Sequence, residues 1–285
     1  MRLEEVGKRY GLRQPWVIRG VSLDVAAGRL IRLEGRNGSG KSTLLRVAAG
    51  ALVPSAGKVT GRPRVGYVPE RFPPALAFTG RDYLLHLGRV HGLRGAALPG
   101  RVQECLARFG AAEYAGTPLR TLSKGMCQKI AIVQAVLASP GLLVLDEAWT
   151  GLDQAARDTL DAVVAERLAE GGRVMFVDHD RRRLATLVGE RWLLGAGRVT
   201  TVHGPDPDAL IPGSQQGPIV IELTGCAPSL AAALRELPAI TTVTGAAGDL
   251  VVRTDAAWSD KVLRMALDHG GAHVKAVRTE PGASS

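Results

Sequence analysis

Before residue 204, short apolar runs alternate with longer stretches in which apolar positions recur at helical spacing. The short runs predict buried strands, because strands covered on both faces show little alternation. These strands are expected at residues 30–34, 64–68, 142–146 and 173–180, with a closing hairpin at 191–202. The longer stretches predict helices at 44–50, 79–93, 98–111, from 123 onward, 154–172 and 180–188. This alternation favours an α/β core with a helical insertion at about 72–139.

A different pattern begins at residues 204–218, where prolines and glycines predict a linker. Beyond it the expected order is strand, helix, strand, strand, helix, strand. These elements fall at 219–223, 228–237, 240–244, 249–253, 257–269 and 272–278. This βαββαβ order is that of a ferredoxin-like domain. The sequence therefore predicts a large domain at 1–203 and a small α+β domain at 219–285.

Composition narrows the possible partners. The chain has 285 residues and a formal net charge of +9, which leaves room for one large and one small domain. Apart from Arg181, Arg182 and Arg183, the basic residues are scattered and do not interleave with aromatic residues as in a nucleic-acid platform. A solvated basic surface is the favoured interpretation, and no nucleic-acid partner is expected. The three cysteines lack metal-binding spacing and are expected to be reduced thiols.

A phosphate-binding loop is predicted between the strand at 30–34 and the helix that follows it. Residues 35–42, GRNGSGKS, fit the pattern G-x-x-x-x-G-K-[ST]. Backbone N–H groups would surround phosphate oxygens, Lys41 would reach the β- and γ-phosphates, and the Ser42 hydroxyl would ligate Mg²⁺. The expected ATP-binding residues here are Gly35, Arg36, Asn37, Gly38, Ser39, Gly40, Lys41, Ser42 and Thr43.

Two carboxylates follow the apolar strand at 142–146. Asp146 and Glu147 end the sequence LLVLDE, at the strand terminus where ligands bind in α/β sheets. Asp146 is expected to hold Mg²⁺ through water. Glu147 is placed to polarise the attacking water as a general base. With the phosphate loop earlier in the chain, this pair predicts nucleoside triphosphate hydrolysis.

Three more motifs occur in order: LSKGM at 122–126, TGLD at 150–153 and VDHD at 177–180. Together with the phosphate loop and LLVLDE, they resemble the ATP-binding subunit of an ABC transporter, over residues 1 to about 203. LSKGM stands at the family's LSGGQ signature, TGLD at its D-loop, and His179 at its switch histidine. The resemblance implies a P-loop NTPase fold of ABC type and an ATPase that uses ATP and Mg²⁺, with Lys41, Glu147 and His179 as catalytic residues.

The resemblance also implies that two cassettes pair head to tail. The signature residues Ser123, Lys124, Gly125 and Met126 would then bind ATP held by the partner's phosphate loop, and Asp153 would belong to the D-loop. The positive end of the signature helix would favour the phosphate, and a side chain at position 125 would block the approach of backbone to ligand. The expected assembly is a homodimer.

Several positions depart from the family pattern. Lys124 replaces a signature glycine, Met126 replaces the glutamine, and Glu70 stands where the Q-loop glutamine is usual. Glu70 could still approach Mg²⁺ and the attacking water. The dipeptide Ala148-Trp149 lacks the usual proline and is expected to loosen the D-loop. A branch of exporters shows the same lysine, methionine and glutamate, so the resemblance favours that branch.

An aromatic platform for adenine is expected upstream of the phosphate loop. Tyr10, in KRYG, resembles the family's A-loop aromatic residue, and Trp16 is the competing candidate. Base–aromatic stacking is worth about 1–3 kcal/mol. For either residue the alternative is ordinary packing at a strand edge.

The expected function is ATP hydrolysis that powers export through a separate transmembrane permease subunit, at the cytoplasmic face of the cell membrane. The alternative is a soluble ABC ATPase that acts on ribosomes or DNA. Chromosome- and repair-type members insert a very long coiled coil between the phosphate loop and the signature, and Lys41 and Ser123 are too close for that. Translation-type members carry two cassettes, whereas this chain has one.

Overall fold

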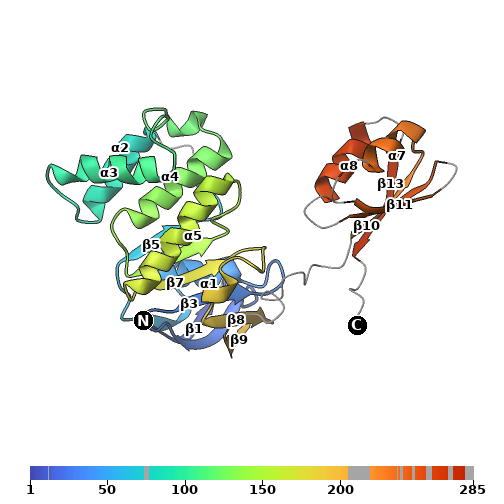
Figure 1. Ribbon diagram of the computed structural model, residues 1–285. Helices are drawn as coiled ribbons and strands as arrows, with labels where there is room; N and C mark the ends of the chain where they lie inside the picture. Colours follow the sequence, from blue (N-terminus) through green and yellow to red (C-terminus); the bar gives the residue numbers. More distant parts are fainter. Residues whose placement is uncertain are drawn as a thin grey trace. The chain divides into compact units, whose positions relative to one another are not determined.

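The computed structural model describes residues 1–11, 13–73, 77–204, 219–235, 237, 240–245, 248–254, 259–268 and 272–279. The chain divides into two compact units, Met1–Leu210 and Ile211–Ser285 (Figure 1). Except for Gly204, the predicted linker at 204–218 lies outside the described residues. In the described part of the chain, no helix is long and apolar enough to cross a membrane.

The first unit is built on a six-stranded sheet in the order β5-β6-β7-β3-β8-β9. Its strands are β3 (Leu30–Glu34), β5 (Val65–Val68), β6 (Leu142–Asp146), β7 (Arg173–Val177), β8 (Glu190–Gly195) and β9 (Arg198–His203). All neighbours are parallel except β8 and β9, which form the predicted hairpin. Every residue of β6 is buried, as its continuous apolar run predicted. The predicted α/β core is confirmed.

A second, antiparallel sheet in this unit was not predicted. It has the order β2-β1-β4, formed by β1 (Arg2–Lys8), β2 (Ile18–Asp24) and β4 (Ala56–Thr60). Its buried residues Leu3, Val6 and Ile18 share one hydrophobic cluster with Leu44 and Leu45 of α1 (Lys41–Ala49). This sheet therefore supports the helix that follows the phosphate loop.

Three helices are gathered at one end of this unit. Figure 1 shows α2 (Gly80–Val90), α3 (Ala97–Arg108) and α4 (Lys124–Val136) away from the hairpin β8–β9, with the short 3₁₀ helix η1 (Leu119–Thr121) leading into α4. Leu84, Val102 and Ile130 are buried in a cluster that reaches the sheet through Leu143 and Leu145. α5 (Gln154–Ala169) follows β6 and belongs to the same cluster.

The predicted helix at 180–188 is wrong: the segment is a series of turns with the 3₁₀ helix η2 (Ala185–Leu187). The Asp178 carboxylate accepts from the backbone N–H of Asp180, and the Asp180 carboxylate accepts from that of Arg182. Such local bonds compete with helical ones. Leu184 also has a φ of 54°, outside the right-handed helical region.

The second unit contains β10 (Ile219–Thr224), α7 (Pro228–Arg235), β11 (Ile240–Thr244), β12 (Leu250–Thr254), α8 (Ser259–Asp268) and β13 (His273–Thr279). Its sheet order is β11-β12-β10-β13, and all neighbours are antiparallel. This is the expected ferredoxin-like βαββαβ arrangement. Ile221, Val252 and Leu230 form its core with other apolar residues of both helices. The predicted ends of the second helix at 257 and 269 lie outside the described residues.

Candidate active site

The phosphate loop, residues 35–42, connects β3 to α1 at the carboxyl edge of the parallel strands. Gly35, Gly38 and Gly40 all have φ between 78° and 148°. A β-carbon on Gly35 would lie 2.6 Å from the Leu194 carbonyl oxygen, and one on Gly40 would lie 3.0 Å from Val17 Cγ1. The loop therefore needs glycine at these points, and it leads into the N-terminus of α1, where an anion is favoured.

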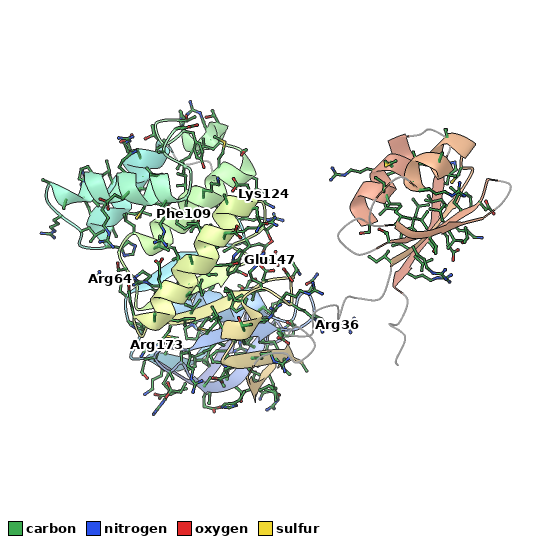
Figure 2. The ribbon with its side chains drawn as sticks, viewed as in Figure 1. Arg36, Arg64, Phe109, Lys124, Glu147 and Arg173 are labelled. Carbon is green, nitrogen blue, oxygen red and sulfur yellow. The ribbon has the colours of Figure 1, made fainter. Side chains whose placement is uncertain are left out.

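Lys41 begins α1 and turns its ammonium group back over the loop. Its Nζ donates to the carbonyl oxygens of Gly35, at 2.7 Å, and Arg36, at 3.1 Å. The positive charge is therefore held where the loop backbone would surround phosphate oxygens. Figure 2 shows Arg36 and Glu147 on the same side of this unit.

Ser42 and Asp146 lie in direct contact. The Ser42 hydroxyl donates to Asp146 Oδ1 at 3.0 Å, and Tyr67 Oη lies 3.5 Å from Oδ2. Asp146 is fully buried, and burial raises the pKa of its carboxyl group, although the hydrogen bond from Ser42 opposes the shift. A cation beside Asp146 would relieve this cost of burying negative charge.

These residues fit Mg²⁺. This ion often binds to one or two protein groups and takes its other ligands from water and substrate phosphates. Ser42 and Asp146 are such a pair, next to the phosphate loop. Among the residues that the structure describes, no group of three or more His, Cys, Asp or Glu side chains could hold a metal by itself.

Two residues near Asp146 were missed by sequence analysis. Arg46 forms a side-chain hydrogen bond with Tyr67, which raises the pKa of the guanidinium, and its charge helps to keep Asp146 ionised. Arg46 lies four positions after Ser42 on α1, so helical spacing could have placed both on one face. Tyr67 pairs with Val144 of β6, but no sequence signal gave that register.

Glu147 and His179 face each other across the ends of β6 and β7. His179 Nε2 lies 2.8 Å from Glu147 Oε1, and the Glu147 backbone N–H donates to the Val177 carbonyl at 3.0 Å. Glu147 has a φ of 53°, unusual for a residue with a side chain. Its carboxylate is thus held next to Asp146 and against an imidazole, where it could accept a proton from water.

Tyr10 and Trp16 have different surroundings. Tyr10 is 60% exposed, and its hydroxyl lies 3.1 Å from Thr43 Oγ1 on α1. The Trp16 ring packs between the Arg9 guanidinium and Gly7, where an added β-carbon would lie 2.9 Å from the ring. Tyr10 is therefore the aromatic ring that is both exposed and close to the phosphate loop.

The helix that begins at the signature also contacts the D-loop of the same subunit. Ser123 caps α4 by accepting from the Met126 N–H at 3.3 Å, and Lys129 of α4 pairs with Asp153 at 2.6 Å. Asp153 also caps α5 by accepting from the Ala156 N–H. The hydrogen bond from Lys129 is the main cause that lowers the pKa of Asp153.

The structure also shows what the residues that depart from the family pattern contact. The Met126 side chain packs partly against the hydrophobic core, whereas Lys124 is exposed (Figure 2). Glu70 has a half-exposed side chain with Arg71 Nε at 3.9 Å, and its charge contributes to the raised pKa of Asp146. Trp149 is buried, and its Nε1 donates to Asp161 Oδ1 at 2.7 Å. This anchor was not expected when the missing proline suggested a looser D-loop.

Known proteins are similar to this chain. The family model described as "ABC transporter" matches residues 18–150. The zinc import ATP-binding protein ZnuC of Halorhodospira halophila is 34% identical over 72% of this chain and 77% of its own length. The aliphatic sulfonates import ATP-binding protein SsuB of Mycobacterium avium is 34% identical, over 74% and 84%. The Nod factor export ATP-binding protein I of Bradyrhizobium diazoefficiens is 31% identical, over 79% and 76%.

Solved structures agree with these relatives. An ATP-binding subunit of an ABC transporter aligns with a TM-score of 0.65 and 26% identity, over 71% of this chain and 89% of that one. A dimeric bacterial ABC transporter cassette aligns with a TM-score of 0.61 at 23% identity, which supports the fold alone. The expected fold and the expected ATPase activity are confirmed, and this chain belongs to the ABC transporter family as an ATP-binding, ATP-hydrolysing subunit.

Proposed function

We propose that residues 1–203 form the ATPase domain that binds and hydrolyses ATP to power transport through a separate membrane permease. The observation that carries this proposal is the 2.8 Å pair of Glu147 and His179, which stands beside the Ser42–Asp146 pair. A nucleotide held by the phosphate loop would place its terminal phosphate near both pairs. The subunit works at the cytoplasmic face of the membrane.

The contacts described above support the following binding roles. Tyr10 stacks on adenine, Lys41 exchanges the loop carbonyls for phosphate oxygens, and the N–H groups of the loop, from Gly35 to Thr43, bind the phosphates. Ser42 and Asp146 would hold Mg²⁺, and Glu70, at the Q-loop position, would be a further residue near it. When bound, Mg²⁺ supplies neutralisation of the charge on the phosphates.

Glu147 acts as the general base for the attacking water. His179 donates to the Glu147 carboxylate and orients it, which is supported by their short contact. Loss of a general base typically costs 10²–10⁴ in rate, so Glu147 is the residue whose replacement should affect turnover most.

The active unit is a homodimer with ATP between the two cassettes. Ser123, Gly125 and the N-terminus of α4 bind the nucleotide of the partner subunit, and Lys124 adds a positive charge. The cap at Ser123 and the contact of Gly125 with the D-loop support this role, because both hold the helix N-terminus in place. Asp153 links the D-loop to the signature helix through Lys129.

The direction of transport is proposed to be export. Lys124, Met126 and Glu70 support this assignment, together with the ferredoxin-like unit that follows the ATPase domain. The similar proteins include several import subunits, for zinc and for aliphatic sulfonates, and an export subunit, so direction needs its own test. A deletion strain should accumulate the substrate inside the cell. A compound that is depleted inside the cell instead would indicate import.

The hydrolysis proposal is tested with Glu147→Gln. This change keeps the shape but removes the base, so ATP binding should persist while phosphate release slows about a hundredfold or more. The variant should also form an ATP-dependent dimer in size-exclusion chromatography with light scattering. Glu113→Gln, at an exposed position in the helical region, is the matched control and should hydrolyse ATP normally. Wild-type turnover by Glu147→Gln would refute the assigned base.

Membrane coupling has a separate test. The full chain should co-purify with a membrane protein from detergent extracts. Recovery of ribosomes or DNA in its place would support the soluble alternative and refute a role in transport.

A further inference from the structure

The loop that carries His179 is held by an arginine from another strand. Arg32 lies in β3, the strand that leads into the phosphate loop, and only 4% of its surface is exposed. Arginine is almost never buried to this extent unless its charge is paired. A buried guanidinium that no sequence motif explains therefore calls for a structural reason.

That reason is a set of backbone carbonyls on both sides of His179. Arg32 Nη2 donates to the carbonyl oxygens of Asp178, at 3.1 Å, and Asp180, at 3.0 Å. Its Nη1 donates to the carbonyl of Arg181 at 2.9 Å. One rigid, planar group thus fixes three peptide units of a segment that forms no regular helix.

The guanidinium of Arg32 also lies near a carboxylate and an aromatic ring. Its Nε lies 3.6 Å from Glu34 Oε1, and its guanidinium lies 5.5 Å from the centre of the Phe176 ring. Removal of this group would leave three backbone carbonyl oxygens without this donor and release the loop. The strand before the phosphate loop and the loop that carries His179 are therefore mechanically joined.

The other end of the same loop is anchored by Arg183. Its Nη1 pairs with Asp161 of α5 at 2.8 Å, and its guanidinium lies over the Trp149 ring at 5.5 Å. Arg32 and Arg183 thus hold the loop at two places. Loss of the contacts with Arg32 would release one of them and move the imidazole relative to Glu147.

We propose that Arg32 is a positioning residue for ATP hydrolysis, which acts by fixing the backbone of residues 178–181 so that His179 meets Glu147. This inference rests on the proposed role of His179 in hydrolysis. The hydrogen bonds of Arg32 to the carbonyls of Asp178, Asp180 and Arg181 connect it to the loop that carries His179. We expect its effect on turnover to pass through this loop.

The test compares Arg32→Met and Arg32→Lys in the wild-type and His179→Ala backgrounds. The matched control is Arg173→Met, because Arg173 Nε also donates to a backbone carbonyl, that of Val25, but at the opposite end of β7 (Figure 2). For each variant, kcat, KM and equilibrium ATP affinity are measured on the full chain, together with the melting temperature.

Arg32→Met is expected to lower kcat about ten- to a hundredfold, the scale on which a misplaced catalytic group costs rate, and to leave ATP affinity within about twofold. Arg32→Lys should fall between wild type and Arg32→Met. In the His179→Ala background, the same change should lower kcat by less than about twofold, since residues that act as a unit are non-additive. Arg173→Met should keep wild-type kcat.

Two results would overturn the inference: unchanged kcat in Arg32→Met, or an equal loss in both backgrounds. If Arg32→Met does not fold, Arg32→Lys carries the same comparison. A failure of the proposed function would give a different result. In that case His179→Ala would keep wild-type turnover, whatever the Arg32 variants do.

Discussion

Gly125 in the signature and Gly151 in the D-loop meet backbone to backbone. A β-carbon on Gly125 would lie 2.6 Å from the Gly151 carbonyl oxygen, closer than real β-carbons approach other atoms. The sequence suggested that position 125 must be bare to admit the partner's nucleotide. The contact adds a reason within one subunit: the signature helix and the D-loop can pack only if this side chain is absent.

Gly125→Ala should therefore separate the two motifs. We expect a loss of about 1–3 kcal/mol in the free energy of unfolding from overpacking, and a lower kcat because the D-loop shifts. Denaturant titration and phosphate release measure the two effects.

A second helical glycine provides the control. Gly100, in α3, has open space where a β-carbon would stand. Gly100→Ala should stabilise the protein by about 0.5–1 kcal/mol, because glycine is a poor helix former, and should leave turnover unchanged. If both substitutions change stability in the same direction, the contact with Gly151 is not what requires glycine at 125.

Tyr10 should govern ATP affinity through its ring. Loss of stacking in Tyr10→Ala removes about 1–3 kcal/mol, which weakens ATP binding roughly 5- to 150-fold. Tyr10→Phe keeps the ring and loses only the contact with Thr43, so its affinity should stay near that of wild type. Equilibrium titration with ATP checks both variants.

Trp16 is the comparison for this experiment. Trp16→Leu removes a ring that packs on Arg9. Its main effect should be a lower free energy of unfolding, with a smaller effect on the affinity for ATP. Weaker ATP binding in Trp16→Leu than in Tyr10→Ala would mean that Trp16, and not Tyr10, stacks on adenine.

Trp149 should act as an anchor of the D-loop. Its Nε1 donates to Asp161, and its ring meets Phe176 edge-on at 5.7 Å. Trp149→Phe keeps most of the ring but removes the donor, so the free energy of unfolding should fall by about 1–3 kcal/mol, as expected when a partly buried acceptor loses a partner. Chemical denaturation measures the loss. Full stability in Trp149→Phe would show that the ring alone anchors the D-loop.

Much of the nucleotide site could be predicted because its residues are constrained by local backbone chemistry. The phosphate loop needs glycines at fixed spacing, and the strand before Asp146 is apolar throughout because both of its faces are covered. Such patterns are contained in a few consecutive residues. The sequence alone therefore placed Lys41 and Ser42 after one buried strand and Asp146 and Glu147 at the end of another.

Features that depend on distant partners could not be predicted in this way. Strand β1 carries Glu4 and Glu5 between the buried Leu3 and Val6, and its register shifts there interrupt the alternation that identifies a strand. No sequence pattern indicated the role of Arg32, because the carbonyl groups that it binds lie about 150 positions away along the chain. Only the fold brings these groups together.

The partly buried carboxyl group of Asp178 should make stability depend on pH. Burial is the largest cause that raises its pKa above the ordinary value of 3.8, against the hydrogen bond from the Asp180 N–H. The folded state therefore binds this proton more tightly than the unfolded state. Its contribution to stability is present below pH 3.8 and is lost as the pH rises through the folded-state pKa.

Asp178→Asn removes this titration but keeps an oxygen that can accept the 2.7 Å hydrogen bond from Asp180. The variant should gain stability relative to wild type as the pH rises from about 4 to 7, because only wild type then bears a partly buried negative charge. Urea titrations of both proteins over this range give the difference in free energy of unfolding. A difference that stays constant with pH, or that shifts in favour of wild type, would mean that nearby arginines compensate fully for the burial of Asp178.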